Sequence, residues 1–143
     1  MPAGSLKVYD INLRQNYYDE KIISDSLRLA DILKINDEEL DIVSKMLSLS
    51  GTQEERCRAI SRAFKLKFVI LTKGGDGSEV VLEDKVHISR PGKIDIVDTV
   101  GAGDSFTAAF ILAYLRGESL EKAHTLATEV SSYVCTKAGA MPE

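Results

Sequence analysis

The apolar run at residues 68–72 constrains the fold of this chain most strongly. It reads Phe-Val-Ile-Leu-Thr and ends on a glycine-rich turn at residues 73–78. A continuous apolar run of this length is typical of a strand that is buried on both faces. Short apolar runs alternate with helical segments through the first half of the chain, which predicts βαβ units. We therefore expect an α/β fold with a mainly parallel sheet flanked by helices.

Periodicity and capping residues place the remaining elements. Thr52 and Glu55 have the spacing of a capping box, so a helix is expected to begin there. Strands are expected at residues 6–11, 31–35, 68–72, 79–82 and 86–88, and helices at about 19–30, 36–50, 52–64, 104–116 and 123–136. The polar residues that follow the strands could gather along one edge of the sheet, where ligands bind in open α/β folds.

The inward faces of two helices are expected from spacing alone. On the first helix this face includes Ile22, Ile23 and Leu27. On the last helix the expected inward residues are Ala123, Leu126, Ala127, Val130 and Val134. The two histidines, His87 and His124, are expected at the surface, since neither has a companion at metal-ligand spacing.

Composition narrows the class of protein. The chain has 143 residues, of which 44% are hydrophobic and 28% charged, which fits one soluble globular domain with its own core. A formal net charge of −4 argues against binding to nucleic acid or to a membrane surface. Cys57 and Cys135 are far apart, so neither a disulfide framework nor a zinc site is expected. A reducing cytoplasm, with no membrane-spanning segment, fits these features.

The glycine turn at residues 101–103 is the clearest candidate for a functional site. Gly101, Ala102 and Gly103 precede Asp104 and a helical segment that ends at Gly117. Free N–H groups and the positive end of the helix dipole meet at such a position, which predicts an anion site that suits phosphate. Asp104 is then either a simple helix cap or a participant in the chemistry of the anion.

Two common phosphate-binding motifs are excluded. The dinucleotide fingerprint would need a third glycine where Phe106 stands. The P-loop would need a Gly-Lys-Ser or Gly-Lys-Thr triplet, and the chain has neither. A shorter glycine turn that ends in a carboxylate remains.

Several ordered segments resemble the ribokinase-like (PfkB) family of carbohydrate kinases. Residues 98–111, with their Gly-Ala-Gly-Asp centre, resemble the family signature at every position. Four other segments agree in family order: residues 10–14 with Asp-x-Asn-x-Arg, 36–39 with Asn-x-x-Glu, 72–78 with the nucleotide loop, and 137–140 with a cation-site segment. The resemblance implies a ribokinase-like fold with a Rossmann-like core and an ATP-dependent sugar kinase activity.

The resemblance also implies roles for individual residues. Asp104 would be the catalytic base, and Gly101, Ala102 and Gly103 would form the anion hole for the transferring phosphoryl group. Asn36 and Glu39 would hold Mg²⁺ through water, although the same spacing equally predicts a helix-capping box.

Further roles follow in the same way, each with a plainer alternative. Thr72, Gly74, Gly77 and Ser78 would bind the nucleotide, or would form an ordinary tight turn; no contact is assigned to Lys73. Asp98 would bind a monovalent cation such as K⁺, or would only form a turn. The assisting cation ligands would be backbone carbonyls near Val100, Val134 and Gly139. Asn12 and Arg14 would contact the substrate, or would be solvated.

The extent of the resemblance defines the expected domain organisation. Residues 1–5 are expected to be a linker or a cloning remnant, and residues 6–143 the C-terminal, nucleotide-binding half of a sugar kinase. The sugar-binding half and lid of the family are expected to be lacking, so this chain alone is expected to be inactive. ATP, Mg²⁺ and a small sugar are the expected ligands, and a homodimer of the full-length protein is compatible with the resemblance. The alternative is a non-catalytic nucleotide-binding module or an inactive fragment.

Overall fold

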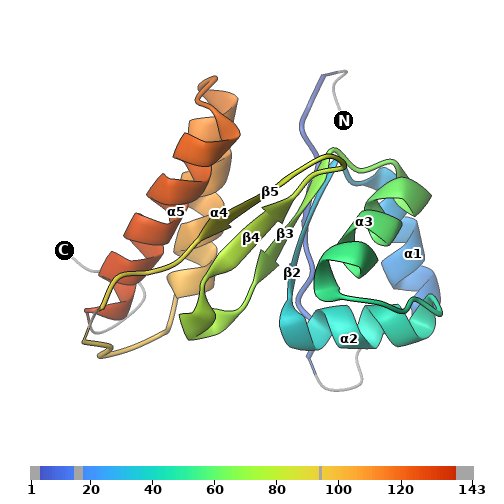
Figure 1. Cartoon of the computed structure of the whole chain (residues 1–143), viewed down its shortest axis with the longest axis horizontal. Helices are drawn as coiled ribbons and strands as arrows, with labels where there is room; N and C mark the ends of the chain where they lie inside the picture. The colour runs from blue at the N-terminus through green and yellow to red at the C-terminus, as the bar shows by residue number, and fades with distance from the viewer. Residues whose placement is uncertain (1–3, 15–17, 94, 138–143) are drawn as a thin grey trace. The chain divides into compact units, whose positions relative to one another are not determined.

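A computed structural model describes residues 4–14, 18–93 and 95–137 (Figure 1). The chain forms two compact units, the first made of residues 1–74 and 79–87 and the second of residues 75–78 and 88–143. The elements are β1 (Val8–Asp10), α1 (Glu20–Leu29), β2 (Ile32–Asn36), α2 (Asp37–Met46), α3 (Gln53–Phe64), β3 (Phe68–Thr72), the 3₁₀ turn η1 (Gly74–Asp76), β4 (Ser78–Val81), β5 (Val86–Ser89), α4 (Ala102–Leu115) and α5 (Leu120–Cys135). The expected α/β class is confirmed.

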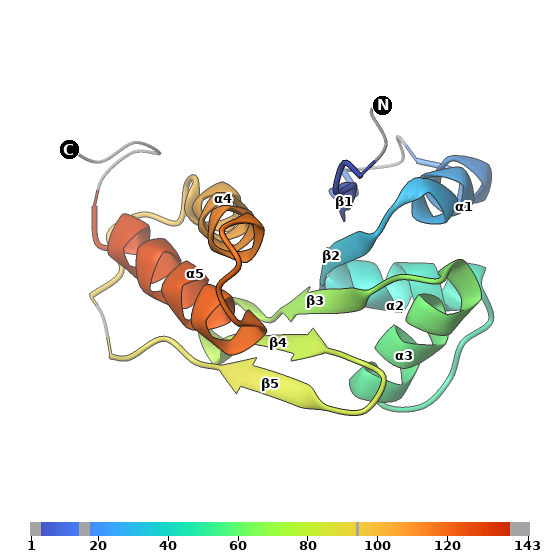
Figure 2. The same cartoon turned by 90° about the horizontal axis from the view of Figure 1, so that it is seen from above.

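The five strands form a sheet in the order β1-β2-β3-β4-β5. β1, β2 and β3 are parallel, with Val8 opposite Ile32 and Ile32 opposite Phe68. The connections before and after β4 are too short for a crossover helix, so β4 and β5 follow as hairpin strands whose arrows alternate in direction (Figure 2). The sheet is therefore mixed, with its parallel part confined to β1, β2 and β3.

The first unit buries its core between β2, β3 and the helices α1, α2 and α3. The apolar run of β3 is buried from Phe68 to Leu71, as expected. On α1, Ile23 and Leu27 are buried, whereas Ile22 is 57% exposed, so its expected inward position is wrong. The buried stripe of this helix is therefore narrower than the apolar sequence pattern predicts.

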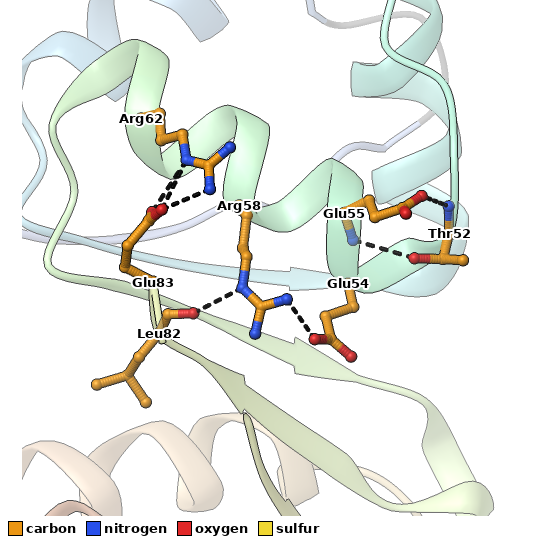
Figure 3. Close-up of polar contacts among 7 residues, drawn as sticks. All are labelled: Thr52, Glu54, Glu55, Arg58, Arg62, Leu82 and Glu83. Carbon is orange, nitrogen blue, oxygen red and sulfur yellow. Dashed lines mark hydrogen bonds and ion pairs between the residues drawn. The ribbon is translucent and has the colours of Figure 1, made fainter. Parts of the chain in front are cut away.

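The start of α3 confirms the expected capping box (Figure 3). Glu55 N donates to Thr52 Oγ1 at 3.1 Å, and Thr52 N donates to Glu55 Oε2 at 2.8 Å. Further along the same helix, Arg58 Nε donates to the carbonyl oxygen of Leu82 at 2.9 Å, and Arg62 Nε donates to Glu83 Oε1 at 2.8 Å (Figure 3). These two arginines attach α3 to the turn between β4 and β5.

The second unit is built on the helix pair α4 and α5. Phe106, Phe110 and Ala113 are buried on α4, which ends at Leu115. Gly117, two residues later, has a φ of 84°, which ordinary side chains rarely adopt. On α5, however, His124 is fully buried and Leu126 is 42% exposed. The expected surface position of His124 and the expected inward position of Leu126 are both wrong, because the buried stripe follows His124, Ala127 and Val134.

The described part of the chain contains no helix whose length and apolar character would let it cross a bilayer.

Candidate functional site

The N-terminus of α4 carries the glycine turn. Gly101 is the N-cap residue with a φ of 79° and makes no side-chain capping bond. The N–H of Ala102 donates to the carbonyl oxygen of Thr99 at 3.2 Å. Among the described residues, no hydrogen-bond acceptor lies on the N–H groups of Gly103 or Asp104. These two donors are therefore available to a ligand, and the side chain of Asp104 in the same turn is exposed.

The other four helices in the described ranges begin differently. In each of them the N-cap side chain accepts a hydrogen bond from the backbone of the first turn. The capping residues are Asp19, Asn36, Thr52 and Ser119. Of these five helices, α4 is the one whose N-cap residue, a glycine, has no side chain to bond with the N–H groups of the first turn.

Asp98 forms a turn just before this helix. Its Oδ1 accepts a hydrogen bond from the N–H of Val100 at 2.9 Å, so the turn-forming alternative is confirmed. The N–H groups of Val97 and Asp98 donate to the carbonyl oxygen of Cys135 at 2.8 and 3.2 Å, which ties this segment to the end of α5. Val134, one residue earlier in α5, is buried.

The proposed cation site is only partly within the described residues. Gly139 lies outside them, and the cation roles of Asp98, Val100 and Val134 stay predictions. Within the described ranges, no cluster of three or more His, Cys, Asp or Glu side chains has the arrangement of a metal site.

In the first unit, Asn36 and Glu39 form a complete capping box at the start of α2. Glu39 N donates to Asn36 Oδ1 at 2.8 Å, and Asn36 N donates to Glu39 Oε2 at 3.0 Å. The other carboxylate oxygen, Oε1, accepts a hydrogen bond from the N–H of Leu13 at 3.2 Å. Glu39 is only 7% exposed. The capping alternative is therefore confirmed, and the magnesium role of the pair stays a prediction.

Glu39 also anchors the loop that follows β1. Because the N–H of Leu13 is bound to this carboxylate, the loop between Ile11 and Arg14 is held at the start of α2. Asn12 and Arg14 themselves are exposed. Their side chains are thus accessible to a substrate, and their predicted contact with it stays a prediction.

A partly buried ion pair near the same strand ends was not anticipated from the sequence. Lys34 Nζ lies 3.0 and 3.1 Å from the two carboxylate oxygens of Asp10, and Lys34 is 9% exposed. The strand register places these residues opposite each other, and places Asn36 opposite Thr72. A lysine inside the apolar run of residues 32–35 was the available signal, since a buried lysine almost always has a partner.

The predicted nucleotide loop is a tight turn, as its plainer alternative requires. Gly74 and Gly77 have φ values of 56° and 97°, and a Cβ on Gly77 would lie 2.4 Å from the carbonyl oxygen of Ser89. Only glycine fits at Gly77 for both reasons. Lys73 Nζ pairs with Glu79 Oε1 at 2.6 Å.

Ser78 differs from the rest of the loop because its side chain is buried. Its Oγ lies 2.7 Å from Nε2 of His124. In this arrangement the hydroxyl is bound within the protein, so any nucleotide contact at this position would come from the backbone. The nucleotide-binding assignments of Thr72, Gly74, Gly77 and Ser78 all stay predictions.

One titrating group with a strongly shifted pKa, Cys57, lies away from these residues. Burial raises the pKa of the Cys57 thiol to about 12, with the nearby Glu79 carboxylate adding to the effect. A thiol with this pKa is protonated at neutral pH and is a poor nucleophile. Cys57 is therefore a core residue of α3 and has no place in the chemistry of the site.

Comparison with known proteins supports the same family. The model for "pfkB family carbohydrate kinase" matches residues 3–143. The chain is 28% identical to fructokinase of Escherichia coli over 116 residues and 33% identical to ribokinase of Arabidopsis thaliana over 128 residues. These matches cover 76% and 87% of this chain but only 36% and 33% of the relatives. The chain thus spans about a third of the length of the curated relatives it matches.

The fold is similar to that of solved kinases. A putative ribokinase II of E. coli, solved in complex with ATP and Mg²⁺, has a TM-score of 0.83 and 24% identity. The match covers 96% of this chain and 44% of that one. The fold is therefore ribokinase-like, as the sequence motifs indicate.

Proposed function

Because the chain belongs to the pfkB family of carbohydrate kinases, we propose that it carries the catalytic residues for ATP-dependent phosphorylation of a sugar hydroxyl. The observation that carries this proposal is the start of α4. Its first turn has no side-chain cap, and an exposed carboxylate, Asp104, stands in the same turn. Phosphoryl transfer to a hydroxyl requires a site that binds the anionic phosphoryl group and a base close to that site.

In the proposed reaction, Asp104 accepts the proton of the sugar hydroxyl as that oxygen attacks the γ-phosphorus of ATP. The bond from the γ-phosphorus to the bridging oxygen breaks, and ADP leaves. The N–H groups of Gly101, Ala102 and Gly103 stabilise the charge on the transferring group. For Ala102 this requires that its N–H turn from the carbonyl of Thr99 to the phosphoryl oxygen. A positioned base contributes roughly 10²- to 10⁴-fold to such a reaction.

Mg²⁺ would neutralise charge on the phosphate oxygens when it is bound. Asn36 and Glu39 fit this ion only through water, because both carboxylate oxygens of Glu39 already accept backbone hydrogen bonds. Each of these oxygens has a further lone pair for a water hydrogen. That arrangement agrees with the preference of Mg²⁺ for retained waters.

The nucleotide would lie against the backbone of the loop at residues 72–78. The positive φ values of Gly74 and Gly77 let the chain turn sharply there, and Gly74 leaves its exposed backbone uncovered by a side chain, whereas Gly77 is buried. A K⁺ ion near Asp98, with carbonyls of Val100, Val134 and Gly139, belongs to the same proposal.

This chain contains few candidate residues for contact with the sugar. Asn12 and Arg14 are the exposed polar residues proposed to contact it. Since the chain matches only about a third of its relatives' length, we expect further sugar contacts and a lid to come from sequence outside residues 1–143. We therefore expect this chain to bind ATP with Mg²⁺ and not to phosphorylate sugars when it is alone.

Isothermal titration calorimetry with ATP and Mg²⁺, run beside a coupled kinase assay on a panel of sugars, tests the proposal. Both are applied to this chain and to the longest natural polypeptide that contains it. We expect ATP binding by both and turnover only by the longer polypeptide. ATP binding without turnover in either would support a nucleotide-binding module instead, and no ATP binding in either would contradict both functions.

A further inference from the structure

A buried polar cluster in the second unit joins the predicted nucleotide loop to α5. Its members are His124 and Thr128 on α5, Ser78 at the start of β4, and Ser89 at the end of β5. Ser78 Oγ lies 2.7 Å from His124 Nε2, and Thr128 Oγ1 lies 2.8 Å from Ser89 Oγ. Two residues one helical turn apart thus bind the first residue of β4 and the last residue of β5, both of which belong to the second unit.

His124 is the central member of this cluster. It is fully buried, and Ser78 is 5% exposed. A buried polar ring without a hydrogen-bond partner lowers the free energy of unfolding, because its lost hydration is not replaced. Removing one partner of a buried pair leaves the other in this situation. The hydrogen bond between Ser78 and His124 therefore restricts where the start of β4 can lie within this unit.

The same imidazole contacts the helix that carries Asp104. The rings of Phe106 and Phe110 on α4 meet the His124 ring edge-on, with centroids 6.0 and 6.4 Å away. Phe106 lies only two residues after Asp104 in the chain. One side chain is thus in contact with the beginning of α4 and with the end of the predicted nucleotide loop.

Gly77 shows that this end of the loop has little freedom. Its backbone passes so close to β5 that an added Cβ would lie 2.4 Å from the carbonyl oxygen of Ser89. Ser89 is in turn held to α5 through Thr128. Gly77 is therefore enclosed between two anchored residues, Ser78 and Ser89.

We propose that His124 is a positioning residue for ATP, which fixes the backbone of Gly77 and Ser78 relative to Asp104 through its ring contacts and its bond to Ser78. This inference rests on the proposed kinase function. It assigns a role in nucleotide binding to a residue that touches neither the nucleotide nor the sugar. Errors of about 1 Å in such positioning can cost on the order of 10²-fold in rate, so the exact placement of this loop matters.

Four variants of this chain test the proposal, one of them, Ser78→Ala, at the other end of the hydrogen bond. His124→Leu replaces the imidazole by an apolar side chain of similar size and leaves the Ser78 hydroxyl without its partner. His124→Gln places an amide where it can still bond with that hydroxyl. Thr125→Val is the matched control, since Thr125 is the exposed next residue on the same helix.

The readouts are the dissociation constant of ATP with Mg²⁺, measured by calorimetry, and amide hydrogen exchange at Gly77, Ser78 and Glu79. We expect His124→Leu to weaken ATP binding by roughly tenfold and to accelerate exchange at these amides. His124→Gln should largely restore both, and Thr125→Val should change neither. Ser78→Ala, which removes the other end of the bond, should accelerate the same exchange and serves if His124→Leu fails to fold.

The outcomes separate this inference from the function on which it rests. If the wild-type chain does not bind ATP, the kinase proposal fails and this one fails with it. If the wild type binds ATP and a folded His124→Leu or Ser78→Ala chain binds it equally well, only this inference is overturned. A lower melting temperature with an unchanged dissociation constant would likewise show a purely structural role and overturn it.

Discussion

The helices α2 and α4 both carry a carboxylate three residues after the N-cap, yet the two carboxylates are in opposite situations. In α2, Glu39 is 7% exposed, and both its oxygens accept backbone hydrogen bonds. In α4, Asp104 is exposed, and its helix begins on Gly101, which makes no side-chain capping bond. The same sequence position is therefore structural in one helix and accessible in the other.

The N-cap residue and the length of the acidic side chain explain this difference. Asn36 provides an oxygen for the first turn of α2, and the long side chain of Glu39 reaches back to the N-cap N–H. Gly101 has no side chain, and aspartate is one methylene shorter. A family motif that pairs a glycine N-cap with aspartate thus leaves donors and carboxylate free for a ligand, at the expense of local helix stability.

The largest expected effect is on catalysis at α4. In the longest natural polypeptide that contains this chain, Asp104→Asn should lower kcat by about 10²- to 10⁴-fold, because the proposed base is lost while the helix keeps its shape. Steady-state kinetics in a coupled assay measures this. Asp84→Asn, at an exposed turn position between β4 and β5, is the control and should leave kcat unchanged. Equal rates for Asp104→Asn and wild type would remove the proposed distinction between the two carboxylates.

The next effect is on stability at α2. Glu39→Ala leaves the N–H groups of Leu13 and Asn36 without their acceptor, which should lower the free energy of unfolding by about 2–3 kcal/mol. Asp104→Ala, the equivalent change in α4, should lower it by less than about 0.5 kcal/mol. Urea denaturation of both variants in metal-free buffer gives the comparison. Similar losses in the two variants would contradict the view that only Glu39 is structural.

Removing the other half of the capping box should cost less. Asn36→Ala should lower the free energy of unfolding by about 1 kcal/mol, since the N–H of Glu39 loses its acceptor. The measurement is again urea denaturation without metal. If the binding free energy of ATP with Mg²⁺ is reduced by much more than the free energy of unfolding, Asn36 also has the predicted magnesium role. Reductions of similar size indicate capping alone.

A further small effect on stability has the opposite sign. A Cβ at Gly103 would meet no atom within 4 Å, so Gly103→Ala should stabilise the chain by about 0.5 kcal/mol. The same methyl group should weaken ATP binding, because it would lie beside the open N–H groups of the first turn. Thermal unfolding and calorimetry measure the two effects. A more stable variant with unchanged ATP affinity would argue against phosphate at this helix.

The sequence predicted those parts of the molecule that are determined locally. The apolar run of β3, the capping residues Asn36 and Thr52, and the glycine turn before α4 are each specified by neighbouring residues. The antiparallel direction of β4 and β5 also follows from short connections, although alternation in the first half of the chain favoured a mainly parallel sheet.

Features that depend on distant partners could not be predicted in this way. The apolar residues of α5 are compatible with more than one buried stripe, and only the packing against α4 places His124 inside and Leu126 outside. The bond between His124 and Ser78 and the ion pair between Lys34 and Asp10 join residues far apart in sequence. Spacing within one helix or one strand contains no information about such partners.

The most direct test of the central claim is an NMR titration of this chain with ATP and Mg²⁺, following the backbone amide signals of Gly103 and Asp104. If the open N-terminus of α4 binds the phosphates, these signals shift and saturate with the ligand, and the same signals in Gly103→Ala shift only at higher ATP concentration. The amide of Glu55, already bound to Thr52 Oγ1 at the start of α3, is an internal reference for a closed helix start. Saturable ATP binding with no shift at Gly103 and Asp104 would contradict the account.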